Sequence, residues 1–496
     1  MSSINLARSA RGLAAASVAA VAAALAGAAS ADAIDAAEAS GEKPVVERLL
    51  DIMLQQKSIT PAQYDELLAQ AKREQGAATA AAAAETPPVS AGPEDWDFKW
   101  NNGFGLERAD GAYKLKFGGR VQLDGAVVSE TDGLNEDLRE IGGEGQGNGV
   151  EFRRARLFFE GTVYERLLFK AQYDFAGGES AFKDVYLGLK GLGPVGTVIA
   201  GQFKEPFLLD EQTSSNYITF MERGLNSAFF PDRNVGLMGM NNALGKRMLW
   251  QVAVFRDTDD FGDAFSSSGR TDWDLAGRVT GLPLWSDDGS RFVHLGAGYV
   301  HRFRGDSVRF RSRPSSHLAD YFADTRSDYD DDLDISASGA DLLNLEAAWV
   351  HGPFSALSEY THAFVDGDDG QSKVDFFGGN AQVSYFLTGE HKVYEPEWGR
   401  FGRVKPKANF DPADGGWGAW ELAARFSYLD LDDRDVRGGR LWDVTAGLNW
   451  YLFPNARIML NYVHADVSKR EALVDASTFD VTGSGDIVQT RLQVDF

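Results

Sequence analysis

The last ten residues, Ile487-Val-Gln-Thr-Arg-Leu-Gln-Val-Asp-Phe496, alternate between two kinds of side chain. Leucine, valine and the terminal phenylalanine fall on one face of an extended strand, and arginine, glutamine and aspartate fall on the other. Segments 119–127, 168–175 and 457–462 show the same alternation. The pattern predicts β-strands that each have one apolar face and one polar face.

A soluble β-sandwich could produce the same alternation, because one face of an antiparallel sheet can be wet. Two features favour a membrane barrel. Phe, Tyr and Trp are frequent near the ends of the alternating segments, as in the aromatic girdles of a barrel at the bilayer interfaces. The chain also ends in Phe496 on an alternating strand, which resembles the signal by which outer-membrane barrels are recognised for insertion. In lipid, only a closed barrel satisfies the backbone groups of every strand.

The length of the alternating region predicts the number of strands. Roughly 400 residues remain after position 94, and a spanning strand takes about 9–11 residues, with short turns at one end and long loops at the other. At about 25 residues per strand and connection, we expect an all-β, transmembrane antiparallel β-barrel of about 16 strands. A barrel of this size encloses an aqueous lumen.

The N-terminus predicts export from the cytoplasm. Arg8 and Arg11 form a basic region, residues 12–27 are an apolar run, and small-x-small cleavage sites end at Ala33. This order is typical of a secretory signal peptide, which we expect over residues 1–33.

Residues 34–94 differ in composition from the rest of the chain. Residues 34–75 contain two stretches of helical periodicity, and a capping box begins at Thr60, which predicts a pair of short amphipathic helices in the periplasm. Their apolar stripes are too small for a stable core, so the helices either pair with copies in other chains, like a coiled coil, or fray. The Ala-, Pro- and Ser-rich residues 76–94 are expected to be a linker, and residues 95–496 the barrel.

The chain is acidic and has no cysteine. Its 73 acidic and 49 basic residues give a formal net charge of -24, and no nucleic-acid partner is expected. The absence of cysteine excludes disulfides and cysteine metal sites. Acidic segments 326–334 and 366–370 are expected to be solvated external loops, with divalent-cation bridging to lipopolysaccharide as the alternative.

Five arginines nevertheless lie between positions 302 and 313. In a strand, Arg309, Arg311 and Arg313 would project to one side about 7 Å apart, and Arg302 and Arg304 form a second pair. Because arginine on the lipid face would cost a few kcal/mol, these side chains are expected in the lumen or above the membrane. A lumenal row of guanidinium groups offers donors to phosphate or carboxylate and lets an anion move between sites. The alternative is an Arg-rich external loop that balances local acidic residues.

A second basic cluster is Phe152-Arg-Arg-Ala-Arg156. By alternation, Arg154 and Arg156 share a face and Arg153 opposes them, unless a β-bulge turns Arg153 inward. Residues 213–223 then lose the alternation, which indicates a loop that folds into the lumen and narrows it.

Nine segments resemble the family of phosphate-selective porins, the porins O and P. They are FGGRVQLD (117–124), FRRARLFFEG (152–161), FKAQYDFAGG (169–178), GQFKEPF (201–207), TSSNYITFMER (213–223), VRFRSRP (308–314), YFLTGE (385–390), GAWELAARFSYLDL (418–431) and LNWYLFPNARIMLNYVHA (448–465). The resemblance covers about residues 95–496, and the N-terminal helices look like the periplasmic extension of some members. It implies a homotrimer of 16-stranded barrels in the bacterial outer membrane that passes phosphate or other anions by passive diffusion.

The resemblance also implies roles for single residues. It places basic residues along an anion path, as ladder arginines (Arg309, Arg311, Arg313), constriction arginines (Arg120, Arg153, Arg154) and exit lysines (Lys114, Lys116). Strongly phosphate-selective members carry Lys directly after Thr-Ser-Ser, where this chain has Asn216, and an acidic group near Lys183, for which it offers Asp184. Lys204 could supply the missing positive charge. The Asn216 departure weakens the case for a tight phosphate site and leaves anion preference as the expectation.

Other functions compete with a phosphate or polyphosphate porin. A general porin, or one for organic or sugar acids, would have the same fold. A hydrolase needs a nucleophile beside a base, and the seven histidines are scattered without such a setting. Because phosphate-loop and zinc spacings are also absent, we expect neither an enzyme nor a bound cofactor or metal. A structural tether would rest on the N-terminal helices alone.

Overall fold

The computed structural model describes residues 96–100, 103–141, 148–178, 180–264, 272–304, 307–326, 334–474 and 477–496, together with residues 61, 64, 65 and 69. The chain divides into two units, residues 1–94 and 95–496. In the first unit, the four described residues are helical and lie in the second predicted helix. The predicted signal peptide, first helix and linker lie outside the described residues.

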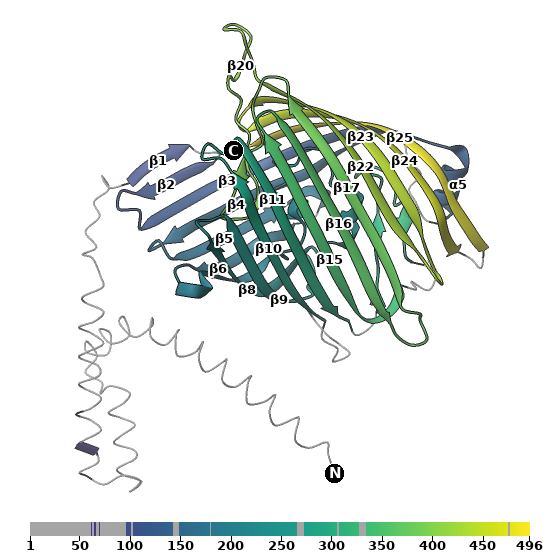
Figure 1. Ribbon diagram of the computed structural model, residues 1–496, viewed down its shortest axis with the longest axis horizontal. Coiled ribbons are helices and arrows are strands. Elements are labelled where there is room, and N and C mark those ends of the chain that lie inside the picture. The colour runs from purple at the N-terminus through teal and green to yellow at the C-terminus, as the bar shows by residue number, and fades with distance from the viewer. Residues whose placement is uncertain are drawn as a thin grey trace. The chain divides into compact units, whose positions relative to one another are not determined.

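Among the described residues, sixteen strands close into an antiparallel barrel (Figure 1). They are β3 (Tyr113–Glu130), β4 (Gly149–Val163), β5 (Leu167–Asp174), β6 (Ala181–Leu189), β7 (Thr197–Lys204), β8 (Arg233–Ala243), β9 (Met248–Arg256), β10 (Trp273–Trp285), β11 (Arg291–Phe303), β15 (Ile335–His351), β16 (Phe354–Gly367), β17 (Val374–Phe386), β22 (Ala419–Asp433), β23 (Val436–Phe453), β24 (Ala456–Val474) and β25 (Ser477–Asp495). Each strand pairs with the next, which confirms the predicted fold and strand number.

The C-terminal strand closes the barrel. β25 pairs with β3, from Gly485 opposite Glu130 to Asp495 opposite Arg120. Phe496 continues the pairing by exchanging backbone hydrogen bonds with Gly119, at 2.7 and 3.0 Å. A hairpin of β1 (Trp96–Trp100) and β2 (Phe104–Arg108) then extends the sheet along the first part of β3.

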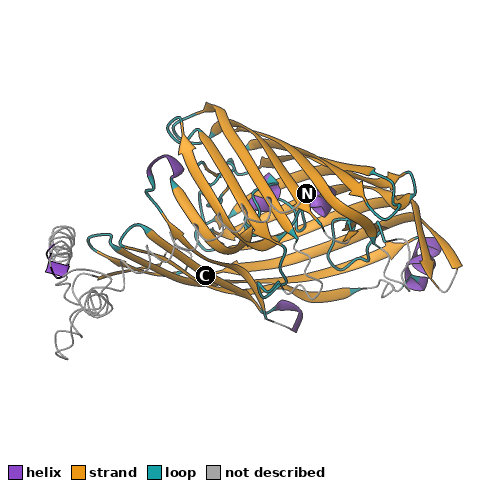
Figure 2. Cartoon of the chain, turned by 90° about the horizontal axis from the view of Figure 1, so that it is seen from below, coloured by secondary structure: helices purple, strands orange, loops and turns teal. Residues whose placement is uncertain are grey.

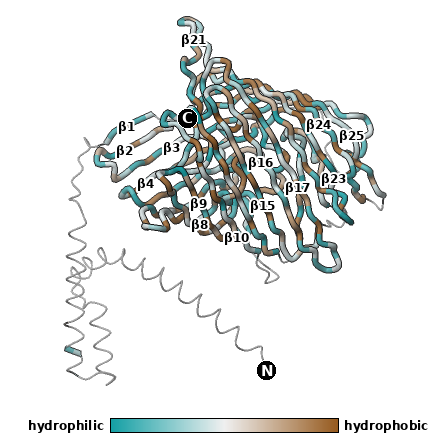
Figure 3. Tube along the Cα trace, in the orientation of Figure 1, coloured by the Kyte–Doolittle hydropathy of each residue, from teal (hydrophilic) through white to brown (hydrophobic). Residues whose placement is uncertain are grey.

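The alternation of side chains decides which face of each strand meets lipid. In β25, Leu492 and Val494 are 49% and 48% exposed on the outer wall, whereas Arg491 is 0% exposed on the inner side. Apolar and polar positions alternate in the same way along β16 and β17 (Figure 3). The barrel therefore presents an apolar wall outward and a polar lining inward, as the sequence predicts. Among the described residues, no helix is long and apolar enough to cross a membrane.

The two ends of the barrel differ. At the end that carries the C-terminus, connections such as 164–166 and 454–455 are short turns, and we call this the short-turn end. The other end carries long loops, one of which contains α5 (Asp132–Glu140). In outer-membrane barrels the short turns are periplasmic and the long loops are extracellular.

Three segments fold from the ends into the lumen, where short helical turns lie between opposite walls of strands (Figure 2). Loop A (205–232) contains α6 (Leu209–Gln212) and η4 (Leu225–Phe229), loop B (304–334) contains β12 (Ser307–Val308), β13 (Arg311–Ser312) and β14 (Ala323–Asp324), and loop C (387–418) contains β18 (Tyr394–Glu395), β19 (Arg400–Phe401), β20 (Phe410–Asp411) and β21 (Gly416–Trp417). The β20–β21 hairpin of loop C projects away from the barrel instead (Figure 1). Loop A includes the predicted inward segment 213–223.

Hydrogen bonds to inward side chains of the wall fix loop A and loop B. Arg457 donates to the Ile218 carbonyl at 2.9 Å, which holds loop A against β24. Gln489 donates to the Ser315 carbonyl at 2.9 Å, which holds loop B against β25. The expectation that residues 308–314 form a strand is therefore corrected, because these residues belong to an inward loop with only two-residue bridges.

Candidate functional site

A cavity of about 530 Å³ lies in the lumen between loop A and the wall that β3–β7 form. Twelve Lys or Arg residues line it, against six Asp or Glu residues. The chain as a whole has the opposite balance, with a formal net charge of -24. Positive charge is therefore concentrated where the lumen is enclosed, and its local field favours anions.

Two guanidinium groups in this cavity have no carboxylate partner at ion-pair distance among the described residues. Arg120 donates through Nη1 to the Ser215 hydroxyl at 2.7 Å and, more weakly, to the Ser214 hydroxyl at 3.4 Å. Arg154 donates through Nη1 to the Gln122 amide oxygen at 2.9 Å, and its buried Nε has no hydrogen-bond partner in the described ranges of the chain. Because guanidinium stays charged, both groups present uncompensated positive charge beside the tip of loop A.

Arg153 has a different environment, because a β-bulge turns it inward. Gln122 of β3 faces Arg154, but the next β3 residue faces Phe152, so Arg153 is left without a partner in the register. Its Nε and Nη2 then donate to the Glu222 carboxylate of loop A at 2.9 and 3.2 Å. Arg153 faces the lumen, and a carboxylate compensates its charge.

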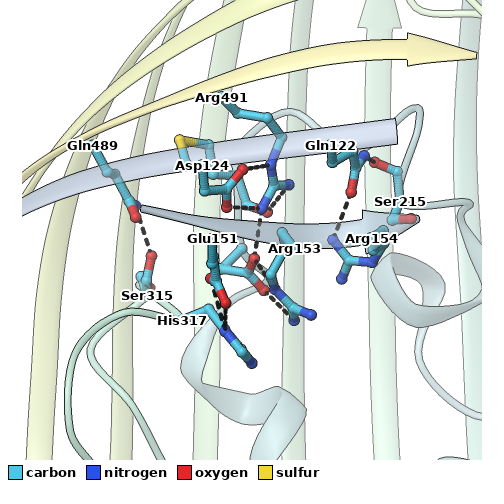
Figure 4. Close-up of polar contacts among 12 residues, drawn as sticks. Gln122, Asp124, Glu151, Arg153, Arg154, Ser215, Ser315, His317, Gln489 and Arg491 are labelled. Carbon is cyan, nitrogen blue, oxygen red and sulfur yellow. Dashed lines mark hydrogen bonds and ion pairs between the residues drawn. The ribbon is translucent and has the colours of Figure 1, made fainter. Parts of the chain in front are cut away.

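Glu222 belongs to a chain of alternating charges that anchors loop A. Arg491 donates to Asp124 through Nε and Nη2 at 2.7 and 2.6 Å, and Nη2 also reaches Glu222 at 2.8 Å (Figure 4). Burial disfavours the charged form of Glu222, but Arg153, Arg154 and Arg491 outweigh it and hold the pKa of this carboxyl well below its ordinary value. Glu222 thus stays ionised and ties loop A to β4 and β25.

Carboxylates also bind part of the arginine row between positions 302 and 313. Arg302 and Arg304 lie 3.5 and 2.7 Å from Asp274. Arg309 donates to Asp324 at 2.8 and 2.5 Å. These three arginines are therefore compensated side chains of the lumen wall and loop B.

Arg311 and Arg313 differ from the other three arginines. Their guanidinium carbons lie 4.2 and 4.3 Å from the ring centre of Tyr321, which holds both against one aromatic side chain. Arg313 also donates to the carbonyl of His317 at 2.9 Å. Neither has a carboxylate at ion-pair distance in the part of the chain that the structure describes.

The sequence model of the phosphate-selective porins O and P matches residues 118–496. The chain belongs to this family. It is 26% identical to Porin O of Pseudomonas aeruginosa over 429 residues, covering 80% of this chain and 92% of that protein. It is 28% identical to a protein of Caulobacter vibrioides over 398 residues, covering 78% of this chain and 75% of that protein.

Solved structures of an outer membrane protein and of a porin align with the chain at low sequence identity. OmpT of Vibrio cholerae has a TM-score of 0.47 and 13% identity, covering 78% of this chain and 98% of that chain. The anion-selective porin from Comamonas acidovorans has a TM-score of 0.45 and 13% identity, covering 77% and 100%. From its family and its barrel, the protein is a porin of the outer membrane.

The remaining predicted residues of this porin lie near the short-turn end or around loop A. Lys114 pairs with Glu107 at 2.7 Å, and Lys116 lies 3.9 Å from Glu160. Lys204 lies 3.4 Å from the Glu211 carboxylate of loop A.

Asp184 and Asn216 also line the porin's cavity. Asp184 accepts a hydrogen bond from Arg233 at 2.8 Å and lies 3.6 Å from Lys170. The side-chain oxygen of Asn216 is buried and has no hydrogen-bond partner among the residues that the structure describes.

Reasoning from sequence missed Arg403 of loop C. Arg403 pairs with Asp495 of β25 and donates to the Tyr217 hydroxyl of loop A at 3.0 Å, with its guanidinium 5.1 Å from that ring. It joins loops that enter from opposite ends of the barrel. Loop C has no alternation from which an inward side chain could be inferred. Lys170 was also missed, although its place on the polar face of 168–175 was a usable signal.

Proposed function

We propose that this porin passes anions by passive diffusion along the basic residues of its lumen. The observation that carries the proposal is the cavity that twelve basic and six acidic residues line, in which Arg120 and Arg154 have no carboxylate at ion-pair distance within the described part of the chain. An anion that enters the cavity exchanges part of its hydration shell for guanidinium donors, and no covalent bond changes.

The proposed path has two stations of uncompensated arginine. Arg311 and Arg313 form the first, at the long-loop end, and Arg120 and Arg154 form the second, beside loop A. Arg153, Arg302, Arg304 and Arg309 support the lumen wall and loops through their carboxylate partners, with a smaller direct role. Lys116 and Lys114 are the proposed exit. Several weak sites in series favour conduction, because no single site traps the ion.

Phosphate is the proposed preferred anion, with polyphosphate as a longer ligand of the same chemistry. The hydroxyl groups of Ser214 and Ser215 lie beside Arg120, so a tetrahedral oxyanion would meet neutral donors and a guanidinium together. Asn216 favours the second candidate, a general or organic-acid porin, because a neutral amide binds phosphate more weakly than an ammonium group. The homotrimer and contact with lipopolysaccharide remain predictions from family resemblance and from the acidic loops.

Replacement of Asn216 by Lys is expected to strengthen block of the chloride current by phosphate. The ammonium group would add a third positive charge beside Arg120 and Arg154, and we expect the half-blocking phosphate concentration to fall about tenfold, or ~1.4 kcal/mol. The measurement is chloride conductance in a planar bilayer during phosphate titration.

Asn216→Gln is the matched control, because it lengthens the side chain without adding charge. Its half-blocking concentration is expected to stay within about twofold of the unmodified porin, or ~0.4 kcal/mol. Chloride current that phosphate fails to block in the unmodified porin and in Asn216→Lys alike would rule out a phosphate site here and leave the general anion porin.

A further inference from the structure

A second cavity, of about 390 Å³, continues the lumen toward the short-turn end. It shares Lys116, Lys170, Lys204 and Arg400 with the cavity beside loop A, so the two are neighbouring parts of one path. Lys114 lines only the second of these two cavities. We call this second cavity the vestibule.

One side of the vestibule is basic. Lys114, Lys116 and Lys170 project from β3 and β5, and their side chains are 57%, 34% and 21% exposed, so water and solutes reach their ammonium groups. Lys116 and Lys170 have one carboxylate nearby in common, that of Glu160, at 3.9 and 3.2 Å. Lys170 also lies 3.6 Å from Asp184, but five Lys or Arg residues line the vestibule against two Asp or Glu residues, so the vestibule retains positive charge.

The other side of the vestibule is aromatic and aliphatic. Tyr186 of β6, Phe203 of β7 and Met238 of β8 line it from the barrel wall, and Trp398 of loop C covers it. The rings of Tyr186 and Phe203 are 6.1 Å apart, edge to face. The Arg400 guanidinium lies over the Trp398 ring, 5.1 Å from the ring centre. The inward faces of porin strands are ordinarily polar because they contact water in the lumen. Apolar side chains beside the lysines therefore suggest contact with a solute that has an apolar surface.

A small inorganic anion cannot use this apolar lining. Phosphate and chloride have no apolar surface, so they gain only from the charges of the vestibule. An anion that carries a ring could place the ring against Trp398 and Tyr186 while its charged group meets Lys114 and Lys116. Aromatic stacking and ammonium contacts would then act on the same solute.

We infer that the vestibule binds organic anions in which an aromatic ring carries a phosphate or carboxylate group. The inference rests on the proposed anion pathway and adds to it the class of solute that the exit favours. The basic side alone would serve inorganic phosphate, whereas the paired apolar side selects for ring-bearing anions.

Phenyl phosphate and inorganic phosphate are the two probes, applied in turn to each side of a bilayer that contains the full-length porin. Block of the chloride current is expected to require about tenfold less phenyl phosphate than inorganic phosphate. Trp398→Ala is expected to raise the half-blocking concentration of phenyl phosphate about fivefold and to leave that of inorganic phosphate unchanged. Trp398→Phe keeps an aromatic ring, so its half-blocking concentration of phenyl phosphate should be close to that of the unmodified porin.

Trp417→Ala is the matched control, because Trp417 also belongs to loop C but is 63% exposed and does not line the vestibule. It should leave block by both probes unchanged. Equal half-blocking concentrations of the two probes in the unmodified porin would overturn the inference, and so would equal effects of Trp398→Ala and Trp417→Ala. If the reversal potential of the unmodified porin showed no preference for anions, the proposed anion pathway itself would be overturned. Failure of the pathway and failure of the vestibule inference therefore give different results.

Discussion

The double variant Arg120→Gln, Arg154→Gln is expected to lower the permeability ratio of chloride over potassium about tenfold. Two unit charges 4 Å apart interact with about 4 kcal/mol at an effective dielectric constant of 20, and water and salt in the lumen reduce this further. If each removed charge lowers the stabilisation of chloride in the lumen by ~0.7 kcal/mol, the two together give the tenfold effect. Both arginines lie in the enclosed part of the lumen, and neither has a carboxylate at ion-pair distance among the residues that the structure describes. Reversal potential in a salt gradient measures the ratio.

A variant of the same cavity that preserves net charge is the control for this effect. Arg156 lies 2.6 Å from Asp174, so Arg156→Gln combined with Asp174→Asn removes a guanidinium together with its partner. Its permeability ratio is expected to stay within about twofold of the unmodified porin. Equal losses in the two double variants would mean that loss of wall structure, and not of uncompensated charge, lowers the selectivity.

Arg491→Met is expected to lower the free energy of unfolding by about 3–5 kcal/mol. Arg491 is fully buried and binds Asp124 at two points and Glu222 at 2.8 Å. Its removal leaves the buried Asp124 carboxylate without its cation and takes one of the cations from Glu222 of loop A, which costs more than the pair itself contributes. Denaturant unfolding of the folded barrel, followed by tryptophan fluorescence, measures the loss as a lower midpoint at unchanged slope.

An arginine–aspartate pair whose arginine is exposed provides the comparison. Arg437 lies 2.7 Å from Asp432 with a side chain that is 46% exposed, and Arg437→Met is expected to change stability by about 0.5 kcal/mol or less. Similar losses in Arg491→Met and Arg437→Met would contradict the view that the buried chain of charges holds loop A and the C-terminal strand together.

The barrel could be predicted from the sequence because lipid imposes a simple rule on its strands. Most residues on the outer wall must be apolar and every backbone group must be paired, so segments such as 487–496 alternate with a period of two residues. The structure has this alternation in β25, and the strand closes the barrel against β3. The length of the region then gave the strand number.

Loop B shows where the same reasoning fails. Residues 308–314 alternate like a strand, with Val308 and Phe310 buried and Arg309 and Arg311 on the other side, yet they belong to a loop inside the barrel. Alternation of apolar and polar residues with a period of two indicates an extended backbone whose two faces have different surroundings. It does not report whether the apolar surroundings are lipid or the interior of the lumen.

Charge compensation was also beyond the sequence. Arg153 and Arg154 are neighbours with the same side chain, but Glu222 neutralises the first and Gln122 only hydrogen-bonds the second. The distinction depends on partners that are 69 and 32 residues away in the chain. Only the folded structure brings these partners beside the arginines. The sequence therefore predicted the basic cluster but not which of its arginines lack a carboxylate partner.

The most direct test of the anion pathway is the reversal potential of the unmodified porin in a planar bilayer that separates two KCl concentrations. Because uncompensated arginines line the enclosed part of the lumen, we expect a potential whose sign shows that chloride crosses faster than potassium. The expected preference weakens as salt rises, because screening shortens the reach of the arginine charges. A potential of the opposite sign, which the net charge of -24 would favour if the outer loops governed entry, would contradict the pathway.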